Sequence, residues 1–162
     1  MGSAYDSVLT LLEEQKVIYE DLLSVSKIKQ TELVKGSLLA LDSLTRREEA
    51  LIFQAGRLED ERFRYTNELI TANNLEANAS IVQVFEAAPT DVKRRMEDIH
   101  NQLVAALAEL DKINRENISL IQQSLRILNY TIETISQDTK ITYSPDEGRA
   151  GDKKSLLLDR RV

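Results

Sequence analysis

The chain has 162 residues, a formal net charge of −6 at pH 7 and no cysteine. This length supports one domain with a hydrophobic core and leaves little room for a second. The lack of cysteine excludes disulfides and thiolate-bound metals, and the acidic balance argues against a nucleic-acid groove, which needs clustered basic side chains. The longest purely apolar run, residues 103–108, is too short to cross a membrane, and the N-terminus lacks a secretion signal. We therefore expect a cytoplasmic protein without membrane insertion.

The first half of the chain is expected to form two long helices, because glycine and proline are rare before residue 140. The first runs from Ser3 to about Lys29, where the helical pattern of apolar residues breaks. Ser37 is the expected N-cap of the second, which runs to about Tyr65. The first helix carries the apolar stripe Val8, Leu11, Ile18, Leu22 and Val25, with Gln15 as its one polar member, and the second carries Leu41, Leu44, Leu51, Ala55 and Leu58.

The asparagine-rich residues 66–88 predict one or two short helices with irregular joints, the second around residues 79–87. Pro89 suits the first turn of a further helix that continues to about Gln137. At 1.5 Å per residue that helix is roughly 70 Å long, which is too long for a compact globule. The predicted fold is therefore all-α, an elongated antiparallel helical bundle or coiled coil of three long helices plus short connecting helices. We expect the bundle to span residues 1–138 and a flexible C-terminal tail to span residues 139–162.

The long helix changes its apolar face partway. An initial set of apolar positions is followed by a second set in a different register, which is reached from Leu110 by two four-residue steps through Asn114. A separate set lies across serine and threonine positions of the same half, and two apolar faces require two partners. The initial set is Met96, Ile99, Leu103, Leu110 and Ile113; the second, here called the main stripe, is Ile118, Ile121, Leu125, Leu128, Ile132 and Ile135; the separate set, here called the minor stripe, is Leu120, Ile127 and Tyr130.

No pattern of catalytic residues is recognisable. Glu97 and His100 have the spacing found in di-iron carboxylate bundles, but such sites need a second pair, and the chain has one histidine. His100 is therefore interpreted as a surface histidine. The neighbouring glutamates at 13–14 and 48–49 point about 100° apart on a helix and form no acid–base pair by themselves. We expect neither enzymatic activity nor a metal or cofactor.

Four motifs, taken in order, resemble the FlgN family of flagellar export chaperones. They are "KQTELVKGSLLALDSLTRREEALI" at 29–52, "LEDER" at 58–62, "INRENISLIQQSLRIL" at 113–128 and "TYSPDEG" at 142–148. The last departs from the family pattern at Ser144 and Glu147. The resemblance covers nearly the whole chain. It implies a cytosolic, non-enzymatic, all-helical protein that holds the hook-filament junction proteins FlgK and FlgL, its clients, and delivers them to the type III export gate protein FlhA.

The candidate sites lie on the second half of the long helix and just beyond it. Clients are expected to bind there as amphipathic helices. The resemblance also implies that Tyr143, with Ile141 beside it, contacts the export gate. The candidate client-binding residues are Ile118, Leu125, Leu128 and Ile132 on the main stripe, with Leu120, Ile127 and Tyr130 as the alternative face.

Three alternatives remain open from the sequence. A coiled-coil scaffold or adaptor protein explains the heptads equally well, although it does not explain the two stripes. A homodimer is possible, because a surplus apolar stripe can pack against a second copy. The tail leucines at 156–158 either dock on the client-binding stripe, belong to the site or form an unimportant terminus.

Overall fold

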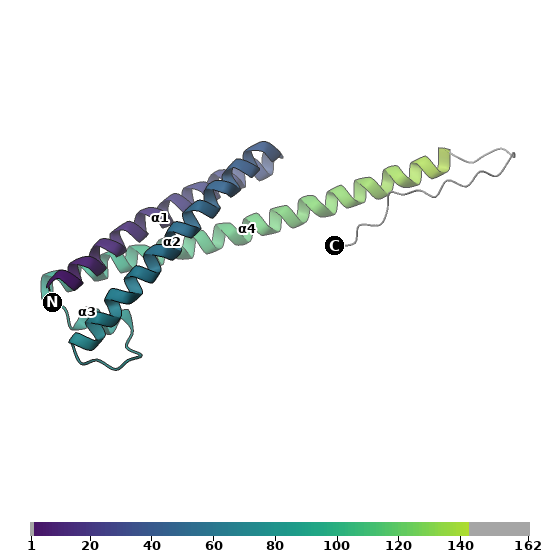
Figure 1. Ribbon diagram of the computed structural model, residues 1–162. Helices are drawn as coiled ribbons and strands as arrows, with labels where there is room; N and C mark the ends of the chain where they lie inside the picture. Colours follow the sequence, from purple (N-terminus) through teal and green to yellow (C-terminus); the bar gives the residue numbers. More distant parts are fainter. Residues whose placement is uncertain (1, 143–162) are drawn as a thin grey trace. The chain divides into compact units, whose positions relative to one another are not determined.

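The computed structural model describes the backbone of residues 2–142 and the side chains of residues 4–139. This part of the chain contains no strand and four helices, α1 (Gly2–Lys35), α2 (Leu38–Ala72), α3 (Ile81–Glu86) and α4 (Thr90–Thr142) (Figure 1). The predicted all-α class is confirmed. The chain divides into two compact units, Met1–Gln123 and Ser124–Val162, each of which is considered by itself. The boundary expected after residue 138 stays a prediction, and the tail residues 143–162 lie outside the described part.

Helix α1 ends at a glycine rather than where the apolar pattern breaks. Gly36 has φ 73°, the left-handed conformation that glycine adopts without a steric penalty. Its N–H donates to the carbonyl oxygens of Glu32 and Leu33, and the N–H of Ser37 donates to that of Glu32 at 3.2 Å. These bonds form a Schellman motif, which satisfies carbonyls that the helix end leaves free. The expected end at Lys29 was therefore wrong by six residues.

Helix α2 begins after Ser37, as predicted, and ends in the same manner as α1. Ser37 has extended backbone at the N-cap position, although its side chain makes no capping hydrogen bond. At the other end Asn74 takes the left-handed conformation with φ 50°, and the N–H of Leu75 donates to the Ile70 carbonyl at 3.0 Å. Asparagine tolerates this conformation better than most residues, so it can end a helix as glycine does. Helix α2 therefore ends at Ala72, seven residues past its expected end.

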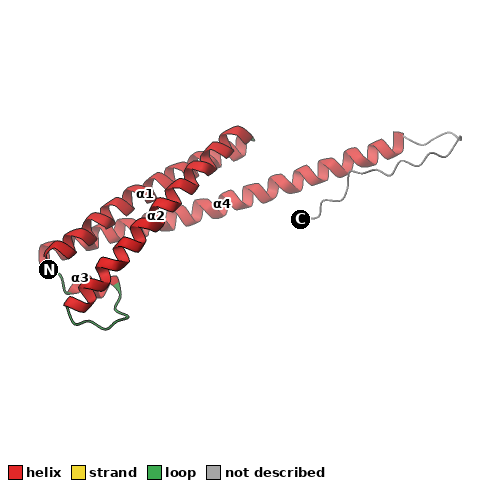
Figure 2. Ribbon diagram, in the orientation of Figure 1, coloured by secondary structure: helices red, strands yellow, loops and turns green. Residues whose placement is uncertain are grey.

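A single short helix, α3, connects α2 to α4, and the remaining residues of this connection form loops (Figure 2). Ser80 and Gln83 form a capping box: the Ser80 hydroxyl accepts from the Gln83 N–H, and the Gln83 side chain accepts from the Ser80 N–H. Helix α4 starts directly after Pro89, whose carbonyl accepts from the Lys93 N–H at 2.8 Å. It continues to Thr142, five residues past the expected end.

Within the unit Met1–Gln123, both α2 and α4 pack on α1. Gln15 bonds to Glu59 and Lys29 to Glu48, so α1 and α2 run antiparallel, and they lie side by side in Figure 1. Glu13 pairs with Arg95 and Lys27 with Glu109, so α1 and α4 run parallel. The larger core cluster joins residues of all four helices, namely Tyr5, Val8, Leu9, Leu12, Leu69, Ile70, Val84, Phe85, Met96 and Leu103. A smaller cluster contains Leu22, Val25 and Leu51, with Ile18, Tyr19, Leu44 and Leu110 against it.

The predicted stripes of α1, α2 and the first half of α4 supply much of this core. On α1 every predicted member is buried except Ile18, which is half-buried, and even Gln15 is only 3% exposed. On α2 the residues Leu51 and Ala55 are buried, and the other predicted members are half-buried. On α4 the residues Met96 and Leu103 are buried. The aromatic core residues Tyr5 and Phe85 were not predicted, because each lies near the end of its helix, outside a sustained apolar repeat.

Candidate functional site

The main stripe on α4 is exposed along its whole length. Ile118, Leu125, Leu128 and Ile132 are each 54–55% exposed, while Ile121 is 38% and Ile135 62% exposed. These positions recur every three or four residues, so they share one side of the helix. Exposed leucine and isoleucine side chains in such a row are unfavourable in water, and burying each one fully is worth about 1.5–3 kcal/mol. The main stripe is therefore a surface suited to a binding partner.

The minor stripe is exposed at two of its three residues. Ile127 is 60% and Tyr130 71% exposed, while Leu120 is half-buried. Thr131 and Thr134 lie among them, but their hydroxyls donate to the backbone carbonyls of Ile127 and Tyr130, each at 2.9 Å. Serine and threonine in helices commonly make this bond to the preceding turn. The minor stripe is thus apolar as the sequence suggested, and it offers fewer uncovered apolar residues than the main stripe.

A buried polar contact fixes α4 against α1 just before the main stripe begins. Asn117 is 4% exposed, and its Nδ2 donates to the Ser26 carbonyl at 3.0 Å. The Ser26 hydroxyl in turn donates to Asn114 Oδ1 at 3.2 Å. The Oδ1 atom of Asn117 has no hydrogen-bond partner among the described atoms, and a buried acceptor without a partner is unfavourable in energy. The contact is therefore better explained by the register of α4 on α1 that it fixes than by a gain in stability. The change of apolar register that the sequence indicates at Asn114 therefore lies three residues before Asn117, the last buried residue among the described side chains of α4.

The two residues expected to contact the export gate lie at the edge of the described structure. The backbone of Ile141 belongs to α4, which ends at Thr142. Tyr143 and the tail leucines at 156–158 lie outside the described residues. The roles of Tyr143 and of the tail leucines stay predictions.

A second feature is a groove between α2 and α4, with α1 at its base. Around one half lie Gln15, Tyr19, Glu59, Arg62 and, on α4, residues from His100 to Leu107. The other half is lined by Tyr19, Leu22, Glu48, Ile52, Ala55, Gly56, Glu59, Leu110 and Asn114. Tyr19 and Glu59 belong to both halves, so the two form one continuous groove. Its apolar wall residues Ile52 and Val104 are each more than half exposed, so the described chain leaves most of their surface uncovered.

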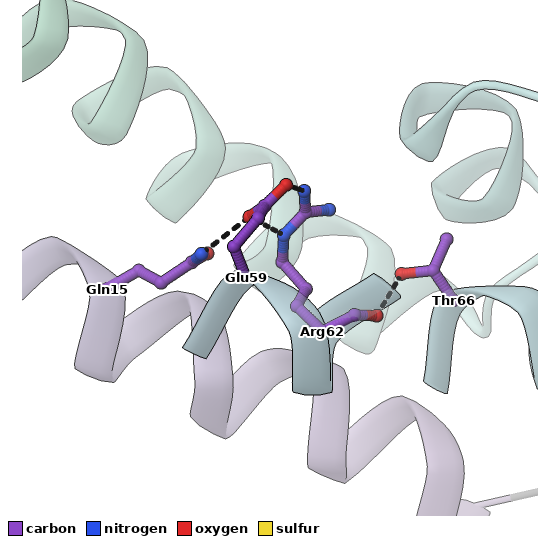
Figure 3. Close-up of polar contacts among 4 residues, drawn as sticks. All are labelled: Gln15, Glu59, Arg62 and Thr66. Carbon is purple, nitrogen blue, oxygen red and sulfur yellow. Dashed lines mark hydrogen bonds and ion pairs between the residues drawn. The ribbon is translucent and has the colours of Figure 1, made fainter. Parts of the chain in front are cut away.

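The carboxylates in this groove are already paired with groups of the same chain. Glu59 accepts hydrogen bonds from Gln15 at 2.7 Å and from both Nε and Nη2 of Arg62, while Thr66 donates to the Arg62 carbonyl (Figure 3). The hydrogen bond from Arg62 lowers the pKa of Glu59 more than burial raises it. Glu48 pairs with Lys29 at 2.8 Å. The groove thus offers apolar walls and internally neutralised charges.

Burial and, to a lesser extent, the nearby Glu59 also raise the pKa of the Tyr19 hydroxyl. His100 is half-buried, and its ring meets that of Phe85 edge to face at 5.6 Å between centroids, so it is a packing residue rather than a freely exposed one. Among the described residues no three His, Cys, Asp or Glu side chains are grouped so as to hold a metal ion. Nor does any described helix combine the length and apolar character needed to cross a membrane.

Known proteins resemble the chain over most of its length. The model of the family described as FlgN protein matches residues 1–150. An uncharacterized protein, YvyG of Bacillus subtilis strain 168, is 22% identical over 139 residues, which is 85% of each chain. No solved structure matches the chain significantly. Because the family match extends over more than nine-tenths of the sequence, from α1 through α4, the chain belongs to the FlgN family of flagellar export chaperones.

Proposed function

We propose that this protein is a cytoplasmic, non-enzymatic chaperone that holds FlgK and FlgL before their assembly and delivers them to FlhA. The observation that supports a holding role is the exposed main stripe of α4. A client segment that is amphipathic and unfolded before assembly gains apolar burial by pairing with this stripe. The same pairing would cover the client's own apolar side and prevent premature polymerisation.

The main stripe is the better candidate for the client site than the minor stripe. Its six residues form one continuous row along the helix, and all of them are exposed, whereas Leu120 of the minor stripe is already half-buried. The central leucines Leu125 and Leu128 are surrounded by further stripe residues on both sides, as is typical of residues that dominate binding energy.

Isothermal titration calorimetry with purified FlgK tests the client site. Leu125→Glu should weaken FlgK binding at least about tenfold, because a carboxylate would be forced into an apolar contact. Gln137→Glu is the matched control, since it adds the same charge on a different side of the same exposed half-helix. Ile127→Glu tests the minor stripe. Weakening by Ile127→Glu together with unchanged binding by Leu125→Glu would assign the client to the minor stripe instead.

Contact with the export gate is proposed for Tyr143, assisted by Ile141. Both residues lie beyond the stripes, so one chaperone could hold its client and contact FlhA together. Tyrosine is an effective anchor, since it has few torsions to immobilise and combines a large apolar ring with a hydroxyl. Tyr143→Ala should leave FlgK affinity and helicity unchanged while abolishing binding of the FlgK-loaded chaperone to the FlhA cytoplasmic domain. Loss of thermal stability with intact FlhA binding would show that Tyr143 is a packing residue instead.

A further inference from the structure

A second groove runs between α1 and α2, and all the residues that line it come from these two helices. Glu14 and Glu61 border both of its halves, so the two halves form one continuous surface, here called the α1–α2 groove. Along α1 it extends from Asp6 to Ile18, which is roughly 18 Å at 1.5 Å per residue. It therefore accepts about three turns of helix. Its apolar lining residues are Leu11, Val17, Ile18, Leu58 and Tyr65.

The apolar lining of the α1–α2 groove is only partly covered by the protein itself. Leu11 is buried, and Ile18 and Leu58 are half-buried. Val17 is 56% exposed, although it lies directly beside these residues in the groove. A helix placed in the groove would remove the exposed surface of Val17 and the remaining surface of Ile18 and Leu58 from water, which favours binding.

Three exposed carboxylates border this apolar lining, those of Asp6, Glu14 and Glu61. None of them forms an ion pair or a hydrogen bond with another described residue. Arg57 is the one cation among the lining residues, so three carboxylates and one guanidinium give the lining a net charge of −2. The neighbouring Arg64 lies over the Tyr65 ring, 4.8 Å from its centre, and pairs with none of the three carboxylates. The groove therefore offers negative charge that the described chain leaves unpaired.

The surroundings of the α1–α2 groove are acidic as well. Residues 6–21 of α1 contain five acidic residues and Lys16 as their one basic residue. The groove between α2 and α4 differs, because its carboxylates Glu48 and Glu59 are paired with basic side chains of the same chain. A cation that enters that groove would have to compete with these contacts, whereas a cation at the α1–α2 groove would meet free carboxylates. The difference in pairing indicates a basic occupant for the α1–α2 groove.

We propose that the α1–α2 groove binds an amphipathic helix of a partner protein whose apolar side is flanked on both edges by lysine or arginine. The apolar side would pack on Val17, Ile18 and Leu58, as a helix does in a hydrophobic groove. Glu14 belongs to α1 and Glu61 to α2, so they lie on opposite walls and require basic residues along both edges of the partner helix. The proposal goes beyond the holding of FlgK and FlgL, because it assigns a partner to a surface that contains no residue of α4.

Fluorescence anisotropy with a labelled synthetic helix of leucine and lysine, about 18 residues long, tests the proposal on the full chain. At about 0.15 M NaCl, where charges further apart than about 8 Å are largely screened, the wild type should bind this peptide and not its leucine–glutamate counterpart. The double variant Glu14→Lys with Glu61→Lys should weaken binding at least about tenfold, because two attractive contacts become repulsive. The matched control is Glu49→Lys with Glu76→Lys, which changes the net charge equally at exposed positions outside the groove and should have little effect.

Three outcomes of this measurement would overturn the proposal. Equal weakening by the two double variants would show a non-specific attraction between charges. Weakening by Leu125→Glu, with no effect of Glu14→Lys and Glu61→Lys, would place the peptide on the main stripe of α4 instead. Removal of residues 149–162, which contain five basic and two acidic residues, should leave the peptide affinity unchanged. A gain of about tenfold on this removal would assign the groove to the chain's own tail rather than to a partner.

Photo-crosslinking of the same peptide to the wild-type chain gives a second test that needs no folded variant. A photoreactive group on the apolar side of the peptide should form crosslinks to residues 6–18 of α1 and 54–65 of α2, which contain the groove. Crosslinks confined to α4 would overturn the proposal. FlgK takes part in neither experiment, and Glu14→Lys with Glu61→Lys should leave FlgK affinity unchanged, so this proposal and the proposed function can fail separately.

Discussion

The two halves of α4 have similar apolar spacing and opposite environments. Met96 and Leu103 in the first half are buried within the main core cluster, and Asn117 is the last buried residue among the described side chains of the helix. From residue 121 to residue 139 every side chain is exposed, although this stretch has leucine or isoleucine at every third or fourth position. An amphipathic pattern shows that a helix has a partner, and it does not show whether that partner belongs to the same chain. The contrast makes the second half of α4 our candidate for recognising other molecules.

Truncation of a leucine in each region should give the largest difference. Leu12 is 2% exposed within the main core cluster, so Leu12→Ala should lower the free energy of unfolding by about 2–5 kcal/mol. Leu128 is 54% exposed, and Leu128→Ala should change it by less than about 0.5 kcal/mol. Urea denaturation followed by circular dichroism measures both. A comparable loss in the two variants would mean that the second half of α4 is part of a stable core.

Two asparagines on α4 allow the same comparison for a polar side chain. Asn117 donates to the Ser26 carbonyl in a buried position, so Asn117→Ala should cost about 1–2 kcal/mol of stability. Asn129 is exposed, and Asn129→Ala should be neutral or slightly stabilising, because alanine has the higher helix propensity. The same denaturation experiment measures both. Equal effects would argue against Asn117 as the contact that fixes α4 on α1.

Substitution of Gly56 by alanine should stabilise the protein, whereas substitution of a core residue destabilises it. Gly56→Ala should raise the free energy of unfolding by about 0.5–1 kcal/mol, because the added methyl group meets open space and the helix interior gains propensity. Thermal unfolding of a dilute sample, in which any dimer is dissociated, measures this. Destabilisation by alanine would show that a close contact already exists at this position within the chain.

The smallest effect is expected from the pH dependence of the Glu59 cluster. Since Arg62 lowers the pKa of Glu59 in the folded protein, the carboxylate stabilises the fold above its unfolded pKa. That stabilisation is lost as the pH falls through the folded pKa. The melting temperature of the wild type should therefore fall more steeply than that of Glu59→Gln between about pH 5 and pH 3. The difference should be small, because the Glu59 side chain is half exposed. If the melting temperatures of the two proteins fall with pH at the same slope, Arg62 and Glu59 do not form this ion pair in solution.

The sequence predicted the helices and their buried stripes better than the ends of the helices. The seven-residue pattern placed Gln15 within the apolar stripe of α1, and Gln15 is buried there, because the repeat and not the residue type decides its side of the helix. The helix ends were missed because apolar spacing was weighted above local backbone chemistry. Gly36 and Asn74, which adopt the left-handed conformation that ends α1 and α2, were the better signals.

The candidate site could be predicted only in part. The two stripes of α4 were visible in the sequence, yet their exposure was not, since a stripe in the core and a stripe for a partner have the same spacing. The groove was not predicted at all. It is formed by residues that lie far apart in the chain, such as Tyr19, Ile52 and Leu110, and only the packing of α2 and α4 on α1 brings them together.

Hydrogen exchange of α4 with and without FlgK tests most directly whether its second half is the client-binding surface. In the free protein, under conditions that keep it monomeric, amides of residues 118–137 should exchange faster than those of the buried part of α1, because no described part of the chain buries that stretch. Addition of FlgK should slow exchange across residues 118–137 and leave residues 5–26 of α1 nearly unchanged. Protection that instead appears on α1 or α2, with none on 118–137, would contradict the account.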